Sequence, residues 1–283
     1  MEEIQTTENQ AETTPDVIRV HSVTGDLRLH EFRSRVFHNT RFLRVWLPPG
    51  YDDSANAGRR YPVFYLNDGQ NLFEAGTSFT GIEWQIDETA DRLIREGAVS
   101  PMIIVGLDNA AKNRIREYMP HRSLHPILLR GQGTRYPNFL IKEVMPFIAR
   151  NYRVGAGPEN TGLGGSSLGG LIALYTAAVR PGVFGRLLLE SPSLWASNRQ
   201  MIRASREVKR WPERIFLAIG TAEAGREDRN RSVVDDVREL AGIFRRAGLD
   251  DKRLKLVIEE GATHHESAWA RRFPQALSFL FSN

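Results

Sequence analysis

The sequence predicts an α/β protein in which helices cover both faces of a mostly parallel central sheet of about eight strands. Short apolar runs alternate with stretches of helical periodicity along most of the chain, and this alternation is typical of the class. Most of the runs are continuously apolar, as strands buried on both faces require. The 283 residues fit one domain of this kind.

The first two predicted strands, Leu27–Ser34 and Phe42–Leu47, alternate apolar with polar residues. This pattern is typical of antiparallel strands at a sheet edge, and Pro48-Pro49-Gly50 ends the second strand. The continuously apolar runs predict parallel strands. They are Val63–Leu66, Met102–Val105, the segment entering Gly164, Leu187–Leu189, Ile215–Ile219 and Leu254–Ile258.

Helical periodicity fills the segments between the strands. In one of them Leu140, Ile141, Val144, Phe147 and Ile148 share a face at three-to-four spacing, which predicts a helix packed on a sheet. The predicted helices span about 85–96, 138–151, 168–180, 199–209, 231–247 and 267–281. The long polar stretch of about 110–136 lacks a clear pattern and is interpreted as a functional loop over the strand ends.

The N-terminal residues 1–16 carry almost no apolar side chains. They cannot bury enough surface to offset the entropy of ordering, so we expect a disordered tail before a single domain of residues 17–283. This segment also lacks the basic and apolar regions of a secretory signal, which makes a cytoplasmic location the default expectation.

Composition excludes several classes of function. The 38 basic residues are interleaved with 34 acidic ones, which argues against a nucleic-acid partner, and no apolar run is long enough to predict a membrane span. The chain has no cysteine, so disulfides, thiolate metal sites and a cysteine nucleophile are excluded. The sequence does not determine the oligomeric state, and a homo-oligomer is one of the states it leaves open.

The strongest chemical signal is Gly165-Ser166-Ser167-Leu168-Gly169, which follows a predicted strand and opens a predicted helix. This Gly-x-Ser-x-Gly context is that of a nucleophile elbow, a sharp turn that lifts a serine hydroxyl above the sheet at a helix N-terminus. Small residues must flank the serine because the turn crowds the backbone. Ser166 stands one position early in the pattern, so Ser167 is the predicted nucleophile.

A serine needs a base, and in folds with this elbow the acid and then the histidine follow the serine in the chain. Only His264 and His265 lie beyond Ser167, in a loop after the last predicted strand. We favour His264, with His265 as the alternative. The acid is expected just past Ile215–Ile219, where Glu223 stands nearest the strand end and Glu227 and Asp228 follow.

The anionic tetrahedral intermediate that a serine nucleophile forms needs two preorganised N–H donors. One is expected to be the backbone of Leu168, and the other should come from the loop Asn67–Phe73. Gly69 permits an unusual backbone angle, which would turn the Gln70 N–H inward. Gln70 and Leu168 are therefore the predicted oxyanion donors.

With these residues in place, the chain resembles the "putative esterase", or esterase D-like, family of α/β-hydrolases. That family includes S-formylglutathione hydrolases, enterochelin esterases, feruloyl and acetylxylan esterases and mycolyltransferases. The resemblance covers nearly everything after the tail. It is carried by Tyr65–Phe73, Trp84 with Asp87, Arg116-Glu117-Tyr118, Glu159–Gly170, Ser191-Pro192-Ser193, Gly220–Glu223 and His264-His265-Glu266 with Trp269.

The resemblance implies the α/β-hydrolase fold, Ser167 as nucleophile, Glu223 as acid, His264 as base, and Gln70 with Leu168 as oxyanion donors. Many relatives have aspartate where this chain has Glu223. The candidate substrate-binding residues are Trp84, which the resemblance places beside the substrate, Trp195, a second aromatic wall, Asn71, beside Gln70, and Arg116, on the basic long loop.

The resulting hypothesis is a serine carboxylic-ester hydrolase that acts on a small-molecule ester through an acyl-enzyme, with a Ser-His-Glu triad. No metal or organic cofactor is implied. Acyl transfer in the same fold is one alternative, and a catalytically silent binding module is another. The substrate ester is not identified by the sequence.

Overall fold

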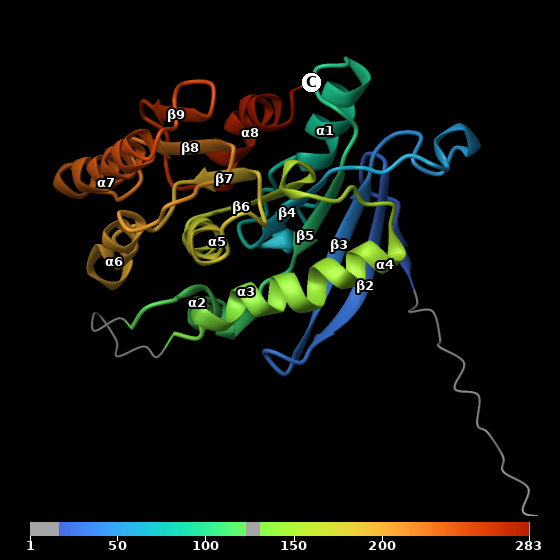
Figure 1. The fold of residues 1–283 in the computed structure, drawn as a ribbon, viewed down its shortest axis with the longest axis horizontal. Coiled ribbons are helices and arrows are strands. Elements are labelled where there is room, and N and C mark those ends of the chain that lie inside the picture. Colours follow the sequence, from blue (N-terminus) through green and yellow to red (C-terminus); the bar gives the residue numbers. More distant parts are fainter. Residues whose placement is uncertain (1–16, 123–130, 283) are drawn as a thin grey trace, which may run out of the picture.

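The computed structural model describes residues 17–122 and 131–282, so the predicted tail, residues 1–16, lies outside the described residues (Figure 1). Within these residues, nine strands form one sheet in the order β1-β2-β3-β5-β4-β6-β7-β8-β9. The strands are β1 Ile18–Val20, β2 Asp26–Ser34, β3 Asn39–Leu47, β4 Val63–Asn67, β5 Ile103–Leu107, β6 Thr161–Ser166, β7 Arg186–Glu190, β8 Arg214–Gly220 and β9 Leu254–Glu259.

The predicted fold class is confirmed. Strands β2 and β3 pair antiparallel and β3 joins β5 antiparallel, whereas the strands from β5 to β9 pair in parallel. The additional strand β1 pairs with β2 at the edge. It was not predicted because it has only three residues, too few to carry an alternating pattern.

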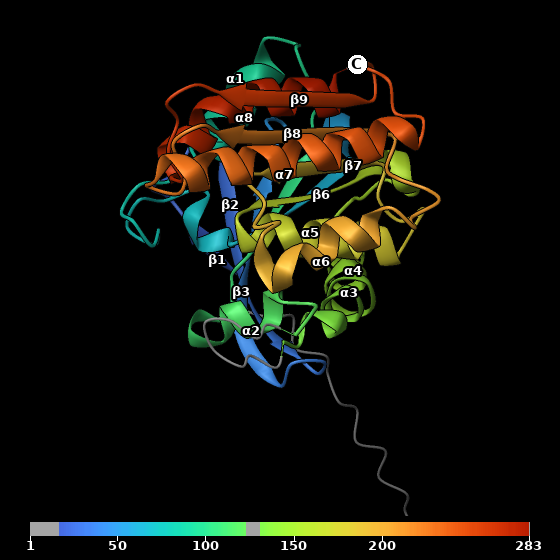
Figure 2. The ribbon, with the colours of Figure 1, turned by 90° about the vertical axis from the view of Figure 1, so that its left-hand side faces the viewer.

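The helices lie in two layers, one on each face of the sheet (Figures 1 and 2). α1 and α8 cover one face, where Trp269 and Phe273 pack with Phe64 and Phe216 of the sheet. The other helices cover the opposite face and bury a second core. The α-helices are α1 Ile86–Arg95, α2 Arg114–Tyr118, α3 Tyr136–Phe139, α4 Met145–Asn151, α5 Leu168–Val179, α6 Ala196–Ser205, α7 Glu227–Arg246 and α8 Glu266–Phe281.

Two helical segments depart from regular geometry. α3 and α4 are joined by a π-helical turn, Leu140–Val144, within the predicted helix of 138–151. In α6 the first turn contains Ser197, Asn198 and Arg199 with left-handed backbone angles, which explains why the periodic pattern begins only near residue 199. Helix α2 lies in the stretch that carried no predicted element, because five residues are too few to show periodicity.

The connections around β4 determine where a ligand can bind. The chain leaves β4, returns in β5 on one side, and then crosses to β6 on the other side. In open α/β sheets such a reversal leaves a crevice at the carboxyl ends of the strands, where ligands bind. The segments that follow β4 and β6, beginning at Asp68 and Ser167, therefore meet at this crevice.

Candidate active site

Ser167 occupies the sharp turn between β6 and α5. Its backbone angles, φ 56° and ψ −125°, lie in a region that non-glycine residues rarely adopt. The turn is held because the Ser167 N–H donates to Glu190 O at 2.9 Å and Ser167 O accepts from the Ser193 N–H at 3.1 Å. A Cβ on Gly165 would lie 2.9 Å from the carbonyl carbon of Gly169, so the flanking glycine is required by close packing.

His264 and Glu223 face each other from two neighbouring loops. Glu223 follows β8, and its side chain is 4% exposed; His264 stands between β9 and α8 with 35% exposure. The distance from His264 Nδ1 to Glu223 Oε2 is 2.9 Å. A carboxylate at this distance fixes the imidazole tautomer with its proton on Nδ1 and leaves Nε2 free to accept a proton.

The alternative residues have other partners. The ring of His265 caps α8 by accepting the Ser267 N–H. Glu227 and Asp228, in the first turn of α7, are exposed and pair with nearby arginines of their own segment. The structure therefore separates His264 and Glu223 from the other candidates considered in the sequence.

Ser167 and His264 line two adjoining cavities, of about 490 and 670 Å³. The smaller one is also lined by Glu223, Ser193 and Trp195. The larger one is also lined by Gln70, Asn71, Phe79, Arg114, Glu266 and Trp269. Ser167 and His264 are thus common to the linings of the two cavities. The Ser167 hydroxyl oxygen lies 3.3 Å from that of Ser193.

Gln70, in the turn after β4, is one of the residues that line the larger cavity. The N–H groups of Asn71 and Leu72 close this turn on Asp68 O and Gly69 O, and the Gln70 N–H takes no part in these two bonds. Leu168 is the first residue of α5, so its N–H has no intrahelical partner. The role of these two N–H groups as oxyanion donors stays a prediction.

The expected role of Gly69 needs correction. The left-handed angle of this turn is at Asp68, with φ 61°, and Gly69 is not among the glycines with positive φ. Glycine is required instead because a Cβ there would lie 2.6 Å from the carbonyl carbon of Gly106 in β5. The reason is close packing of the turn against the neighbouring strand.

Polar contacts fix this turn on the elbow and on the long loop. Asn67 donates to Gly169 O at 2.8 Å, which ties the end of β4 to α5. Asp68 receives two hydrogen bonds from Arg114, at 2.6 and 2.8 Å, and one from Asn109. The Asp68 carboxylate raises the pKa of Arg114, which burial alone would lower. Arg114 is therefore a charged and well-held part of the cavity wall.

The four candidate substrate-binding residues have different positions. Asn71 and Trp195 line the larger and smaller cavity respectively, and Trp195 is 59% exposed. Trp84 is buried, and its ring packs 5.6 Å from that of Trp269, so it lies behind the cavity wall. Arg116 is exposed and lines neither cavity, whereas Arg114, at the start of the same short helix, lines the larger one.

The segment Glu190–Ser193 has a role that sequence reasoning missed. It holds both backbone groups of Ser167, and the Ser191 hydroxyl donates to Glu223 Oε1. Glu190 is fully buried and pairs with Arg272 at 2.8 Å; burial raises the pKa of Glu190 to about 7. The signal that could have found this segment is an acidic residue at the end of the buried strand Leu187–Leu189, since buried acids are rare without a specific partner.

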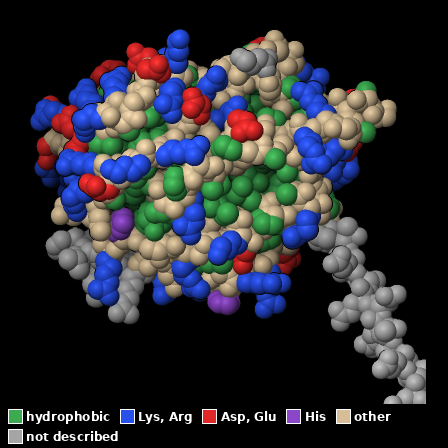
Figure 3. Space-filling view, in the orientation of Figure 1, with side chains coloured by type: hydrophobic (Ala, Val, Ile, Leu, Met, Phe, Trp, Pro, Cys, Tyr) green, Lys and Arg blue, Asp and Glu red, His purple; other side chains and the backbone are tan. Residues whose placement is uncertain are grey.

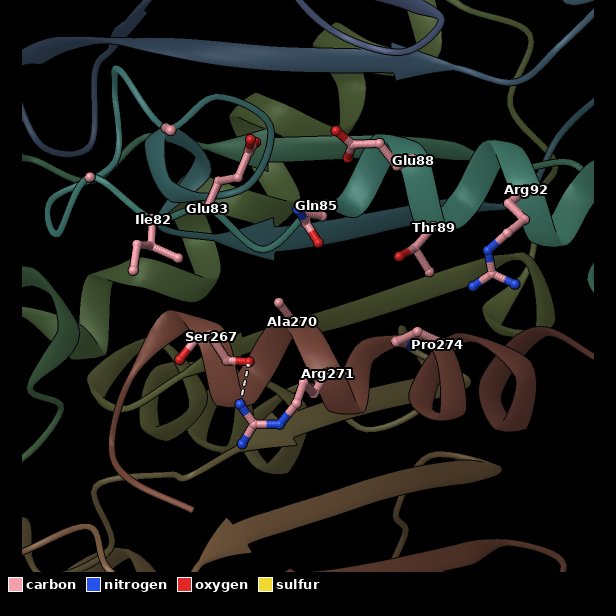
Figure 4. A pocket seen from close by; sticks show the side chains of 12 residues that line it. Ile82, Glu83, Gln85, Glu88, Thr89, Arg92, Ser267, Ala270, Arg271 and Pro274 are labelled. Carbon is pink, nitrogen blue, oxygen red and sulfur yellow. Dashed lines mark hydrogen bonds between the residues drawn. The ribbon is translucent and has the colours of Figure 1, made fainter. Parts of the chain in front are cut away.

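Other surface features lie apart from these residues. A cavity of about 680 Å³ between α1 and α8 contains neither Ser167 nor His264 (Figure 4). On the face seen in Figure 3, Lys and Arg side chains are scattered, with Asp and Glu between them. The described part of the chain has no helix long and apolar enough to cross a membrane. It also has no group of three or more His, Cys, Asp or Glu side chains that could hold a metal ion.

A family model and individual protein sequences both match this chain. A family model described as "Putative esterase" matches residues 34–280. The uncharacterized protein YbbA of Bacillus subtilis is 28% identical over 249 residues, which cover 86% of this chain and 93% of that protein. The endo-1,4-beta-xylanase/feruloyl esterase of Xylanibacter ruminicola is 27% identical over 262 residues, covering 91% of this chain and 31% of that protein.

Solved structures with this fold include esterases. The BES protein from Bacillus cereus superposes with a TM-score of 0.70 at 20% identity, covering 99% of this chain and 100% of that one. The enterobactin esterase FES from Shigella flexneri superposes with a TM-score of 0.69 at 17% identity, covering 95% of this chain and 59% of that one. At these identities the superpositions establish the α/β-hydrolase fold.

Proposed function

The chain belongs to the "Putative esterase" family and is a carboxylic-ester hydrolase, and we propose that it works as a serine esterase through an acyl-enzyme on Ser167. The observation that carries this proposal is the 2.9 Å contact between His264 Nδ1 and the buried carboxylate of Glu223, on the walls of cavities that also expose Ser167. The strained backbone of Ser167 supports it, because such strain clusters at functional sites.

In the first half of the reaction, His264 Nε2 takes the hydroxyl proton of Ser167 while the Ser167 oxygen attacks the ester carbonyl. Glu223 holds the imidazole in orientation and stabilises the imidazolium that forms. The negative charge that develops on the carbonyl oxygen is received by the N–H groups of Gln70 and Leu168. His264 then returns the proton to the departing alcohol, which leaves the acyl group on Ser167.

In the second half, water replaces the alcohol. His264 takes a proton from the water as it attacks the acyl-enzyme, and the same two N–H groups receive the second oxyanion. Collapse of this intermediate releases the acid and restores the Ser167 hydroxyl. In this collapse His264 gives the proton taken from water to the departing Ser167 oxygen, so in both half-reactions His264 acts first as base and then as acid.

The substrate that fits is a small-molecule ester placed across Ser167, with its acyl and alcohol parts in the two cavities. Their volumes, about 490 and 670 Å³, are in the range of small-ligand sites. Relatives named as a feruloyl esterase and an enterobactin esterase support an ester substrate. Asn71, Phe79 and Arg114 in one cavity and Trp195 in the other are the side chains that would contact it.

The direct test is hydrolysis of p-nitrophenyl acetate, butyrate and octanoate by wild type, Ser167→Ala and Ser166→Ala. We expect Ser167→Ala to lower kcat by at least about 10³-fold, because a triad nucleophile cannot be replaced. Ser166→Ala is the matched control, since it removes the adjacent hydroxyl, and should retain kcat within about tenfold. Substantial turnover by Ser167→Ala would contradict the proposal.

A further inference from the structure

We propose that Ser191 and Trp269 are positioning residues that hold the carboxylate of Glu223 in the orientation His264 requires. This inference rests on the proposed function of the same site and deepens it. Glu223 stands on a loop rather than on a strand or helix, so its rotamer must be held by contacts from outside the loop. Those contacts come from Gly220 at the end of β8, from Ser191 just past β7 and, through Ser191, from Trp269 of α8.

The two oxygens of Glu223 are divided between two tasks. Oε2 faces His264 Nδ1 at 2.9 Å. Oε1 accepts the Gly220 N–H at 2.7 Å and the Ser191 hydroxyl at 2.5 Å. With one oxygen held by two donors, rotation of the carboxylate about its terminal bond would break both bonds.

The direction of the Ser191 hydroxyl is fixed by the chemistry of its other neighbours. The indole Nε1 of Trp269 lies 3.0 Å from the Ser191 oxygen, and Nη2 of Arg272 lies 3.4 Å from it. Indole and guanidinium groups only donate hydrogen bonds, so Ser191 must accept from them. Its single proton is therefore left for Glu223. Trp269 therefore directs the Ser191 proton toward Glu223, whose ionised carboxylate can only accept a hydrogen bond.

Ser191 itself is rigidly placed. It is 2% exposed, and its N–H donates to Ala218 O at 2.7 Å. Its backbone φ of 44° is one that residues other than glycine rarely adopt. A strained residue persists only where its surroundings over-determine it, and such residues cluster at functional sites. Glycine would relieve this strain, so the presence of serine here points to a use for the hydroxyl.

Trp269 connects both members of the acid–base pair. Its ring meets the His264 ring edge to face, with centroids 5.1 Å apart, while its N–H holds Ser191. One side chain of α8 thus restrains the histidine through its ring and the acid through its N–H. Phenylalanine at this position would keep the ring contact and lose only the donor.

The test uses Ser191→Gly, which removes the hydroxyl and relieves the backbone strain, and Ser191→Ala, which removes the hydroxyl alone. We expect both to lower kcat for p-nitrophenyl acetate by about 10- to 100-fold with KM nearly unchanged. This is a fraction of the roughly 10⁴-fold that loss of a triad acid can cost. Trp269→Phe should lower kcat less, by about 3- to 10-fold, because the hydroxyl remains but its direction is no longer imposed.

Two controls separate positioning from a structural role. Ser205→Ala removes a buried hydroxyl that bonds only within α6, to Met201 O, and should leave kcat unchanged. In a Glu223→Ala background, Ser191→Gly should change kcat by less than about twofold, because residues that act through one another are not additive. A purely structural effect would multiply with that of Glu223→Ala.

The outcomes distinguish this inference from the proposed function. If Ser167→Ala and Glu223→Ala both keep full activity, the triad proposal fails and the positioning role fails with it. If both lose activity while Ser191→Gly keeps wild-type kcat, or if its effect multiplies fully with that of Glu223→Ala, only the positioning role is overturned. A loss of kcat in Ser191→Gly that disappears in the Glu223→Ala background supports the positioning role.

Discussion

Replacing Gly69 by alanine tests how the turn after β4 positions the Gln70 N–H. The new Cβ would lie 2.6 Å from the carbonyl carbon of Gly106 and 2.8 Å from the Leu107 nitrogen. Both are backbone atoms of β5, at the centre of the sheet, and cannot move aside as a side-chain end could. The turn must therefore shift.

The size of the shift follows from these distances. Ordinary contact begins at 3.4 Å, so the turn has to retreat by about 0.8 Å. A misplacement of about 1 Å at a reacting centre can cost on the order of 100-fold in rate, and loss of one oxyanion donor costs about 10²- to 10³-fold in kcat. We expect Gly69→Ala to lower kcat by about 100-fold and the free energy of unfolding by about 1–3 kcal/mol through overpacking.

The assay is p-nitrophenyl butyrate hydrolysis together with thermal unfolding, and Gly76→Ala is the matched control. Gly76 lies in the same connection from β4 to α1 and is exposed, and a Cβ added there would meet nothing within 4 Å. Gly76→Ala should leave both kcat and Tm unchanged. Wild-type kcat in Gly69→Ala would refute the placement of the oxyanion donor, and an unchanged Tm would refute the packing argument.

Three further predictions concern stability and the choice of base. Arg272→Met should cost about 3–5 kcal/mol, because it leaves the buried Glu190 carboxylate without its cation. Arg272 lowers the pKa of Glu190, which burial raises to about 7 with Arg272 in place. The pKa should therefore rise further in the variant, and the stability difference from wild type should grow as pH rises above 7 in denaturant titrations. Burial also raises the pKa of Asp87 to about 8, so the contribution of Asp87 to wild-type stability should fall as pH rises from about 4, near the unfolded value, to about 8. Asp87→Asn should remove that part of the fall. Equal slopes of unfolding free energy against pH in the wild type and the variant would contradict this prediction. His265→Ala should lower Tm by a few degrees through loss of the α8 cap but keep kcat, whereas a large loss of kcat would make His265 the base.

The order and type of most elements could be predicted from the sequence, because buried parallel strands are short apolar runs and the elbow requires small residues at fixed spacing. Gly165 and Ser167 illustrate this: the motif predicts a crowded, strained turn, and the structure has one. Such features are local, so the residues themselves carry them.

Features that depend on tertiary packing could not be predicted in this way. Trp84 was expected beside the substrate, but its depth depends on how α1 and α8 meet, and it packs behind Trp269. The choice between Arg114 and Arg116 depends on how the short helix α2 is turned, and five residues are too few to show a periodic pattern. The hydroxyl of Ser191 gains its role only when β7, β8 and α8 converge.

The most direct measurement of the central claim is to locate the covalent adduct formed by a fluorophosphonate. Peptide mass spectrometry of the inhibited protein should find one adduct, on Ser167, with activity lost in proportion to labelling. The adduct should be absent in Ser167→Ala and form much more slowly in His264→Ala, because the base activates the serine. An adduct on Ser166 or Ser193, or full ester hydrolysis by protein that carries the adduct on Ser167, would contradict the account.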